Sequence, residues 1–470
     1  MTAPEATPEL DFAEQATQDD RAFLGHPKGL GYLGLVEGCE RFSYYSMQTL
    51  LTLYMVKYLL QPGRQETVIG LEWMRTHLFS GMQGQPLASE IFGLYTALVY
   101  LTPILGGLLA DLWLGRRAAL IAGCVIMSLG HFLMAFEGAF LLALGSLVVG
   151  VGLFKGNIAS QVGELYRPGD IRRAMAFQIF YIFINVSVIA APLVSGTLGE
   201  KVGWHWGFGF AGVVMVVGLL IYLAARRHLP ADPAKASRES QPRARFETGD
   251  GLRLAAVLVL VPIMAVSLLT NQQIFNAYLV WADQQFQLTF LGTSLPTSWM
   301  ITLDATLSFS MLVAVAAFWA FVGKRTGREP DELGKMIIGC AFIICGALCL
   351  YMAALTQGSA RIGLFWPVLF HLFNSIGFSH LLPVSLVLFT RLAPKALNAS
   401  IVGIYYLAFF GANLAVGKIG TLFGTMPATQ FWLLHAASAS VGLVGFGAFR
   451  LLLAGKLMPR SPGPRSHRQA

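Results

Sequence analysis

The sequence predicts an all-α membrane protein with twelve transmembrane helices, arranged as two six-helix bundles around a central cavity. The first observation is composition: of 470 residues, 55% are hydrophobic and only 12% are charged, about half the charged fraction of a typical soluble domain. The second is a series of apolar stretches, each near or above the roughly 20 residues that span a bilayer as a helix. The third is a polar segment midway along the chain, which divides the series into two sets of six.

Short loops separate most of the twelve apolar stretches. The stretches begin near Gly29, Ser89, Arg117, Ala139, Arg173, Trp204, Leu252, Ser298, Lys335, Gly363, Leu397 and Gln430. The segment before the first stretch is polar and acidic, without the apolar core of a cleavable signal peptide. A long loop, Gln61 to Leu87, follows the first helix and carries no pattern that assigns a role to it.

Lysine and arginine concentrate in alternate loops, and the formal net charge is +8. Such an excess is compatible with nucleic-acid binding, but these residues lie in short loops between apolar runs, so we prefer membrane topology and expect no nucleic-acid partner. The positive-inside rule then places both termini in the cytoplasm of a bacterial inner membrane. The basic loops hold Arg116 and Arg117; Arg167, Arg172 and Arg173; Arg226 to Arg245; Lys324, Arg325 and Arg328; and Arg391 and Lys395.

The expected organisation has five parts. Residues 1–28 form a cytoplasmic tail, residues 29–227 the first bundle, residues 228–251 a cytoplasmic linker, residues 252–455 the second bundle, and residues 456–470 a second cytoplasmic tail. The linker region is rich in Pro, Ser, Arg and Ala, which fits a flexible connector. Two packed halves joined in this way are typical of alternating-access transporters.

The first helix carries a polar stripe. Glu37, Glu40, Arg41, Tyr44 and Gln48 recur at helical spacing. Burying three ionisable groups in one membrane helix is unfavourable, so such groups face a wet interior, pair with one another and usually serve function. Two carboxylates against one arginine leave one acid able to titrate. We therefore prefer a functional role over a purely structural ion network.

The fourth helix contains another charge, Lys155, in the stretch Gly152 to Asn157. A lysine at this depth needs a carboxylate partner or water, and Glu37 and Glu40 are the candidates. The alternative is a lysine that reaches the cytoplasmic interface, because the helix ends a few residues later. We favour pairing.

Between the second and third helices, Asp111 ends one helix and Arg116 and Arg117 begin the next. These charges can act as a conformational latch that holds the cytoplasmic ends in one state, or as a topology signal, or as both.

These stretches resemble the proton-dependent oligopeptide transporter family of the major facilitator superfamily, as a divergent bacterial member. The first helix matches the signature E-x-x-E-R-F-x-Y-Y from Glu37 to Tyr45. Tyr100 to Arg117 resembles the second helix and the following loop, and Gly152 to Ile158 resembles the fourth helix. The resemblance spans most of the chain and is strongest through Pro192.

The resemblance implies the major facilitator fold and proton-coupled import of di- and tripeptides. Arg41 and Lys155 would hold the peptide carboxylate. Glu37 and Glu40 would exchange the proton, with Arg41 and Lys155 completing the proton-coupling set. The pocket would be lined by Tyr44, Tyr45, Gln48, Tyr100, Asn185, Asn271, Asp304 and Phe378. The expected partners are a proton, a small peptide or peptide-like substrate and the lipid bilayer, with the protein acting as a monomer.

The sequence departs from the family in the second half. An acid usual in the seventh helix is replaced by an amide in Thr270 to Gln273, and the Gly-Glu pair of the tenth helix reads Gly377-Phe378. Members of the family often have an arginine after the first-helix signature, and this chain has Gln48 at that position. Asp304, in the eighth helix, is the candidate to bind the peptide ammonium instead. The alternative is a hydrated acid near the outer end of its helix.

Other functions remain open at this level. The lost acids favour a carrier of another organic anion, an amino acid or a drug-like metabolite, or an exporter. A non-transporting sensor would predict a broken first-helix charge set, which is intact. No nucleophile–base pair, metal-ligand spacing or phosphate-binding loop appears, so we expect no enzyme, no cofactor and no metal.

Overall fold

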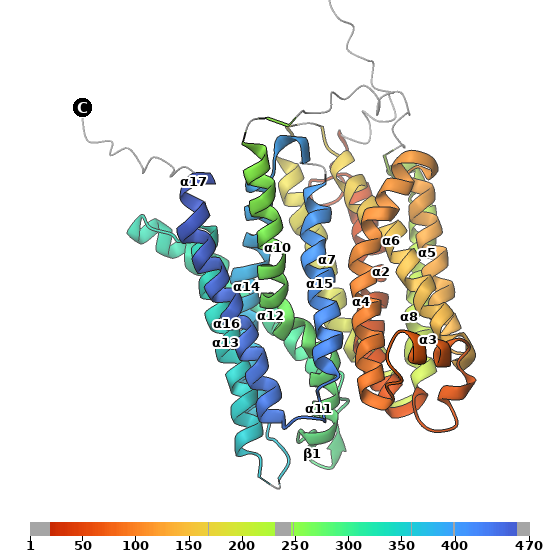
Figure 1. Cartoon of the computed structure of the whole chain (residues 1–470). Helices are drawn as coiled ribbons and strands as arrows, with labels where there is room; N and C mark the ends of the chain where they lie inside the picture. Colours follow the sequence, from red (N-terminus) through yellow and green to blue (C-terminus); the bar gives the residue numbers. More distant parts are fainter. Residues whose placement is uncertain are drawn as a thin grey trace, which may run out of the picture. The chain divides into compact units, whose positions relative to one another are not determined.

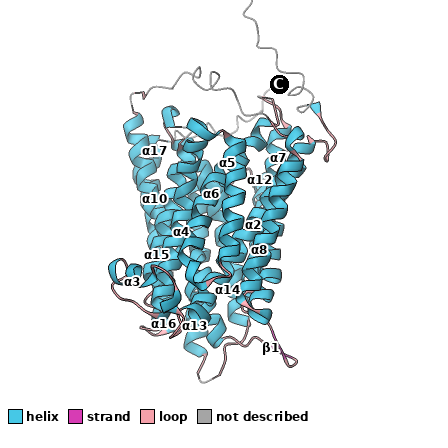
Figure 2. Ribbon diagram, turned by 90° about the vertical axis from the view of Figure 1, so that its right-hand side faces the viewer, coloured by secondary structure: helices cyan, strands magenta, loops and turns pink. Residues whose placement is uncertain are grey.

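The structure is a computed structural model, and the residues that it describes are almost entirely helical (Figures 1 and 2). Residues 19–167, 169–230, 246–247, 249–358, 360–397 and 400–457 are described. Most of the expected N-terminal tail, linker and C-terminal tail lies outside these ranges. The chain divides into two compact units: unit 1 comprises Met1–Gln241 and Leu288–Ala305, and unit 2 comprises Pro242–Gln287 and Thr306–Ala470.

Unit 1 contains the helices of the first half. In it α2 packs against α7 and α8, while α6 packs against α4 and α5. The helices are α2 (Lys28–Tyr54), α3 (Leu71–His77), α4 (Gly84–Leu109), α5 (Arg116–Leu133), α6 (Phe140–Glu164), α7 (Arg172–Ala191) and α8 (Trp204–Ala224). Wider turns of π type are η1 (Met55–Leu59), η3 (Ala110–Leu114), η5 (Pro192–Gly196) and η6 (Leu198–Val202), and 3₁₀ turns are η2 (Gln65–Thr67), η4 (Glu137–Ala139) and η7 (Arg226–His228).

Unit 2 contains most of the second half. In it α13 packs against α14 and α16, and α10 packs against α15 and α16. The helices are α10 (Asp250–Gln273), α11 (Leu279–Gln285), α12 (Trp299–Thr326), α13 (Glu332–Thr356), α14 (Phe365–Leu392), α15 (Ile401–Gly420), α16 (Ala428–Phe449) and α17 (Gly455–Leu457). The wider turns are η8 (Ile274–Tyr278) and η10 (Arg450–Ala454), and Lys395–Leu397 forms the 3₁₀ turn η9. The first residues of α12 belong to unit 1.

The described helices account for the expected membrane spans. Eleven are long and apolar enough to cross a bilayer, and α2, with 27 residues, adds the span that carries buried charges. The chain is therefore a multi-pass membrane protein. The second span begins at Gly84 rather than near Ser89. Pro86 lies in its first turn, where the missing N–H would have no partner within the helix.

Glycines allow α4 and α6 to cross closely. A Cβ at Gly106 would lie 2.0 Å from the carbonyl oxygen of Gly152, so the two backbones are in contact there. Small residues at such crossings are typical of helix packing in membranes, where dispersion contacts replace the hydrophobic effect. The neighbouring Gly107 has no atom within 4 Å of its added Cβ among the described residues.

We expect Gly106→Ala to destabilise the folded protein by about 1–3 kcal/mol, the usual effect of overpacking, because the backbone of α6 must move. Thermal unfolding in detergent measures the effect, with Gly107→Ala as the matched control. Equal unfolding temperatures for both variants would contradict this packing argument.

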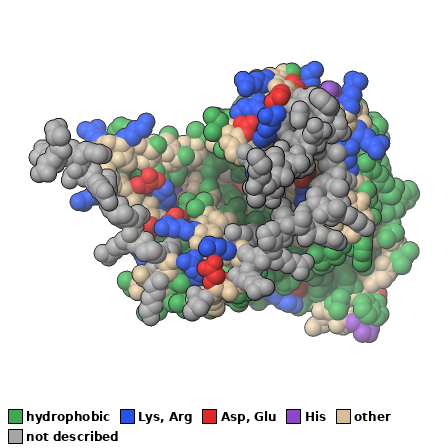
Figure 3. Space-filling model, turned by 90° about the horizontal axis from the view of Figure 1, so that it is seen from above, with side chains coloured by type: hydrophobic (Ala, Val, Ile, Leu, Met, Phe, Trp, Pro, Cys, Tyr) green, Lys and Arg blue, Asp and Glu red, His purple; other side chains and the backbone are tan. Residues whose placement is uncertain are grey.

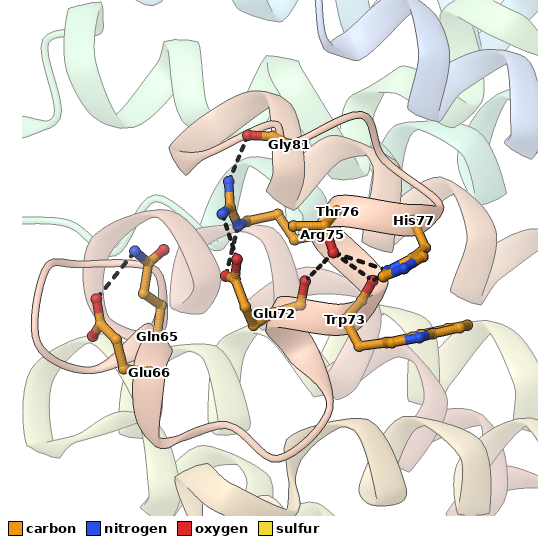
Figure 4. A network of polar contacts seen from close by, with 8 residues as sticks. All are labelled: Gln65, Glu66, Glu72, Trp73, Arg75, Thr76, His77 and Gly81. Atoms are coloured by element: carbon orange, nitrogen blue, oxygen red, sulfur yellow. Dashed lines mark hydrogen bonds and ion pairs between the residues drawn. The ribbon is translucent and has the colours of Figure 1, made fainter.

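The long loop after α2 folds on itself (Figure 4). Arg75 donates two hydrogen bonds to Glu72, at 2.8 and 2.6 Å, and a third to the carbonyl oxygen of Gly81 at 2.7 Å. The hydrogen bonds from Arg75 lower the pKa of the exposed Glu72 carboxyl. Arg64 pairs with Glu137 at 2.9 Å and fastens the loop to η4, just before α6. A two-stranded hairpin, β1 (Thr289–Phe290) and β2 (Thr293–Ser294), precedes α12.

Candidate functional site

The charged residues of α2 form one buried cluster. Glu37, Glu40 and Arg41 are 5%, 0% and 6% exposed. Arg41 binds both oxygens of Glu40, with its Nη2 at 2.6 Å from Oε1 and its Nε against Oε2. The same Nε lies 3.3 Å from Glu37 Oε1. The spacing of three and four residues places these groups on one helix face, as the sequence predicted.

The second oxygen of Glu37 is not satisfied. Glu37 Oε2 is buried and has no hydrogen-bond partner among the described residues. A buried carboxylate oxygen without a donor is unfavourable, and protonation or a ligand removes that penalty. Of the two acids, Glu40 is held by two bonds to Arg41, whereas Glu37 shares only one contact with it. Glu37 is therefore the carboxyl best placed to take up a proton.

Lys155 of α6 belongs to the same cluster. Its charge interacts with those of Glu37, Glu40 and Arg41, and its Nζ lies 4.6 Å from the ring centre of Tyr100. The structure thus brings together the four residues that we expect to couple proton and substrate. An ammonium over an aromatic face at this distance is a favourable cation–π contact.

Tyrosines surround the cations. The Arg41 guanidinium lies 4.9 Å from the ring centre of Tyr44, and the rings of Tyr44 and Tyr45 meet edge to face at 5.1 Å. The hydroxyl of Tyr44 is buried without a partner among the described residues. Two cations, an aromatic wall and an unsatisfied hydroxyl form a surface suited to a small anionic group.

Two other predicted pocket residues of unit 1 have local roles. Gln48 is 2% exposed, and its spacing of seven residues from Arg41 places it on the same face of α2. Asn185 donates from Nδ2 to the carbonyl oxygen of Tyr181 in its own helix, at 2.8 Å. The side-chain amide of Asn185 therefore has a hydrogen-bond partner within α7.

Asp304 lies in the part of α12 that groups with unit 1 and is only 7% exposed. Two residues earlier, Thr302 donates to the carbonyl oxygen of Ile189 on α7 at 3.2 Å. A carboxyl this buried does not fit the alternative of a freely hydrated acid at a helix end. Buried carboxylates in membrane helices mark candidate binding sites.

In unit 2, Asn271 lies just before a break in the seventh span. Asn271 is 7% exposed and accepts a hydrogen bond from Gln272 at 3.3 Å. Asn276, in η8, has a non-helical backbone (φ −118°, ψ −109°) and donates to the carbonyl oxygen of Val416 on α15 at 3.4 Å. Broken membrane helices often mark substrate sites.

Phe378 is half-buried on α14, beside the tight contact of Gly377 with Gly339.

Arg116, one of the three residues that we expect to form a latch, pairs with an additional acid. Arg116 lies 3.5 Å from Asp111 and also pairs with Glu164 at the end of α6. Arg117 instead donates to the carbonyl oxygens of Leu229 and Pro230, at 2.5 and 2.8 Å. Glu164 was not identified from the sequence, although an acid at the end of an apolar stretch, in a chain whose loops on that side are basic, was a usable signal. Lys and Arg side chains gather on the face drawn in Figure 3.

Among the described residues, no group of three or more His, Cys, Asp or Glu side chains is arranged to hold a metal ion.

Comparison with known proteins finds transporters of one superfamily. The Major Facilitator Superfamily model matches residues 39–417. The chain is 30% identical over 513 residues to the peptide transporter YePEPT of Yersinia enterocolitica subsp. palearctica serotype O:3 (strain YE-P4), covering 93% of this chain and 96% of the relative. It is 26% identical to the di-/tripeptide transporter of Lactococcus lactis subsp. lactis (strain IL1403), covering 92% and 95% of the two chains.

Solved structures give the same result. A crystal structure of a mutant of peptide transporter POT in complex with alafosfalin aligns with a TM-score of 0.81 and 27% identity, covering 96% of this chain and all of that one. The same transporter in complex with sulfate aligns with a TM-score of 0.79 and 26% identity, covering 93% and 98% of the two chains.

Proposed function

Because the chain belongs to the major facilitator superfamily and, within it, to the proton-dependent oligopeptide transporter family, we propose that it imports di- and tripeptides or peptide-like molecules together with protons. It is a transporter and not an enzyme. The observation that carries the proposal is the buried α2 cluster, in which the cations Arg41 and Lys155 stand beside Glu37, a carboxyl with one unsatisfied oxygen.

The carboxylate of a peptide is proposed to bind between Arg41 and Lys155. Arg41 is already held by Glu40, so its guanidinium is fixed in place and pays little further loss of rotamer freedom. Lys155 adds a second cation from another helix. Tyr44, Tyr45 and Tyr100 supply apolar walls and hydroxyl groups for the peptide backbone.

Proton uptake on Glu37 would couple to this binding through charge. An added peptide carboxylate competes with Glu37 and Glu40 for the two cations, and protonating Glu37 removes that competition. A loaded site then carries no unpaired buried charge, and the transporter can change state without exposing one to a low-dielectric environment. The membrane potential adds about 2.3 kcal/mol per charge per 100 mV to the driving force.

The test is uptake into proteoliposomes of a small peptide library, with and without an imposed pH gradient, inside alkaline. We expect accumulation of di- and tripeptides only with the gradient, and competition by dialanine against a fluorescent dipeptide. Gradient-independent transport, or competition only by amino acids or non-peptide anions, would favour the alternative of another cargo. No transport of any compound would favour a sensor.

Asp304 is proposed to bind the peptide ammonium, in place of the acids that the seventh and tenth helices lack. We expect Asp304→Asn to lower uptake of a dipeptide at low concentration about tenfold or more, because a charge-assisted hydrogen bond is lost, and to affect an N-acetylated dipeptide little. Asp331→Asn is the matched control, since Asp331 caps α13, asparagine caps equally well, and the ion pair of Asp331 with Arg450 is exposed and contributes little. Unchanged uptake of the free dipeptide at both low and saturating concentration would discard this role.

The protein is proposed to act as a monomer in a bacterial inner membrane, with both termini in the cytoplasm. The basic loops after α4 and α6 support this orientation through the positive-inside rule. Reporter fusions at the two termini test it, and a reporter active only outside the cytoplasm at either end would contradict it.

A further inference from the structure

The beginning of α12 is held by a carboxylate from another part of the chain. Glu200, in η6, accepts hydrogen bonds from the backbone N–H groups of Thr297 and Ser298, each at 2.8 Å, one on each carboxylate oxygen. These donors lie immediately before Trp299, where α12 starts. The first N–H groups of a helix have no partner within the helix and attract negative charge. Glu200 therefore acts as a helix cap supplied from 97 residues away.

Further contacts fasten the same two segments. Lys201 donates from Nζ to the carbonyl oxygen of Ser294 at 2.6 Å. Trp299 donates from Nε1 to Thr197 Oγ1 at 2.9 Å. Donors and acceptors thus alternate between η5–η6 on one side and β2–α12 on the other. All these residues lie in unit 1, although the segment Leu288–Ala305 comes from the second half of the sequence.

The backbones are also in close contact. A Cβ at Gly196 would lie 2.3 Å from Ser298 Oγ and 2.6 Å from Ser298 Cβ. Ser298 is fully buried, and so is Ser195, the residue immediately before Gly196. The wide turns η5 and η6 lack the regular hydrogen-bond ladder of an α-helix, and such turns recur at functional positions in helices. The contact is tight, polar and confined to about one turn of each segment.

We propose that Glu200 clamps the beginning of the eighth span to the end of the fifth, and that this clamp must open for substrate to enter from the side of the membrane on which it lies. The inference rests on the proposed transport function, since a cycle between two states requires segments of the two sequence halves to part. Bonds from one carboxylate to two backbone N–H groups form or break together, which suits a two-state contact.

The clamp also affects the proposed substrate site, because both involve α12. Asp304 lies on the same helix, five residues after Trp299, and Thr302 between them contacts α7. When Glu200 holds the first turn of α12, the position of Asp304 relative to α7 is set as well. Release of the clamp would therefore move a proposed substrate ligand together with the gate.

Gly196→Ala tests the clamp by sterics alone, without altering a charge. The added methyl group meets Ser298, so we expect the clamped state to lose population. Apparent KM for external peptide should fall about threefold, because more molecules present an open site, and the maximal rate should fall because the return step is hindered. Gly209→Ala is the matched control, since no described atom lies within 4 Å of its added Cβ. The double variant Gly196→Ala with Ser298→Gly should restore both constants.

A second measurement does not depend on transport. Ser195→Cys, in a protein whose five native cysteines are replaced, is labelled with a membrane-impermeant thiol reagent in proteoliposomes. We expect slow labelling when Glu200 is present and labelling at least about fivefold faster with Glu200→Gln, because glutamine lacks the charge and turns an NH₂ group toward an N–H donor. Glu72→Gln, in the exposed loop after α2, is the control for loss of one acid.

Unchanged labelling and unchanged KM in both Gly196→Ala and Glu200→Gln would overturn the clamp, even if less folded protein were recovered. If no peptide were transported at all, the proposed function would fail, while faster labelling in the two variants would still support the clamp. Failure of Ser298→Gly to restore KM and the maximal rate in the Gly196→Ala background would also contradict it.

Discussion

Replacing Glu37 with glutamine will remove proton-driven accumulation of peptide while leaving the protein folded and able to exchange one peptide for another. Glu37 shares one oxygen with Arg41 at 3.3 Å, and its other oxygen has no partner among the described residues. Glutamine keeps the shape of the side chain and an oxygen for Arg41, but it cannot take up a proton. The variant therefore resembles the permanently protonated state.

The size of the effect follows from the driving force. A gradient of about one pH unit contributes about 1.4 kcal/mol per proton, which supports a tenfold accumulation of substrate. Uptake into proteoliposomes with an alkaline interior should show this tenfold accumulation in the unmodified protein and none in Glu37→Gln. Counterflow, which needs only the loaded carrier, should proceed in both.

The controls separate coupling from damage. Glu137→Gln makes the same chemical change at a residue that pairs with Arg64 and lies far from the α2 cluster in sequence. This variant should leave accumulation intact. Glu40→Gln removes the charge of Glu40 and places an amide NH₂ group against one of the two Arg41 nitrogens that it binds, so we expect less folded protein rather than a clean loss of coupling. Accumulation against the gradient by Glu37→Gln would show that the proton is carried elsewhere.

The α2 cluster could be predicted from the sequence because its geometry is local. Residues three and four positions apart on a helix must lie on one face, so Glu37, Glu40 and Arg41 were bound to meet once the helix formed. The partnership with Lys155 needed one further step: a charge deep in a membrane helix requires an opposite charge, and few were available.

The Glu200 clamp could not be predicted in the same way. Its acceptor is a carboxylate between two spans, and its donors are backbone groups, which every residue carries and no sequence pattern marks. The break at Asn276 was hidden for a similar reason, because neither proline nor glycine stands in η8 to signal it. Glycine contacts such as Gly196 with Ser298 become visible only when the two backbones are placed.

Replacing Lys155 with glutamine will weaken binding of peptides that have a free carboxylate by about thirtyfold, and will scarcely change binding of the same peptides with an amidated C-terminus. Truncating one partner of a desolvated charge pair costs about 2 kcal/mol or more in binding free energy, which corresponds to a loss of affinity of about thirtyfold. Lys155 lies beside Tyr100 and within the field of Glu37 and Glu40. Competition against a fluorescent dipeptide measures both affinities.

The comparison of the two peptides decides between a binding role and a structural one. If Lys155 only neutralised Glu37 and Glu40, its loss would disturb the cluster whatever the substrate carries, and both peptides would lose affinity equally. If it holds the carboxylate, its removal and the amidation of the peptide remove one and the same interaction, so the two losses will not add. Lys155→Arg keeps the charge and should retain most of the affinity for the free peptide, because a cation on the same helix face can still pair with the carboxylate.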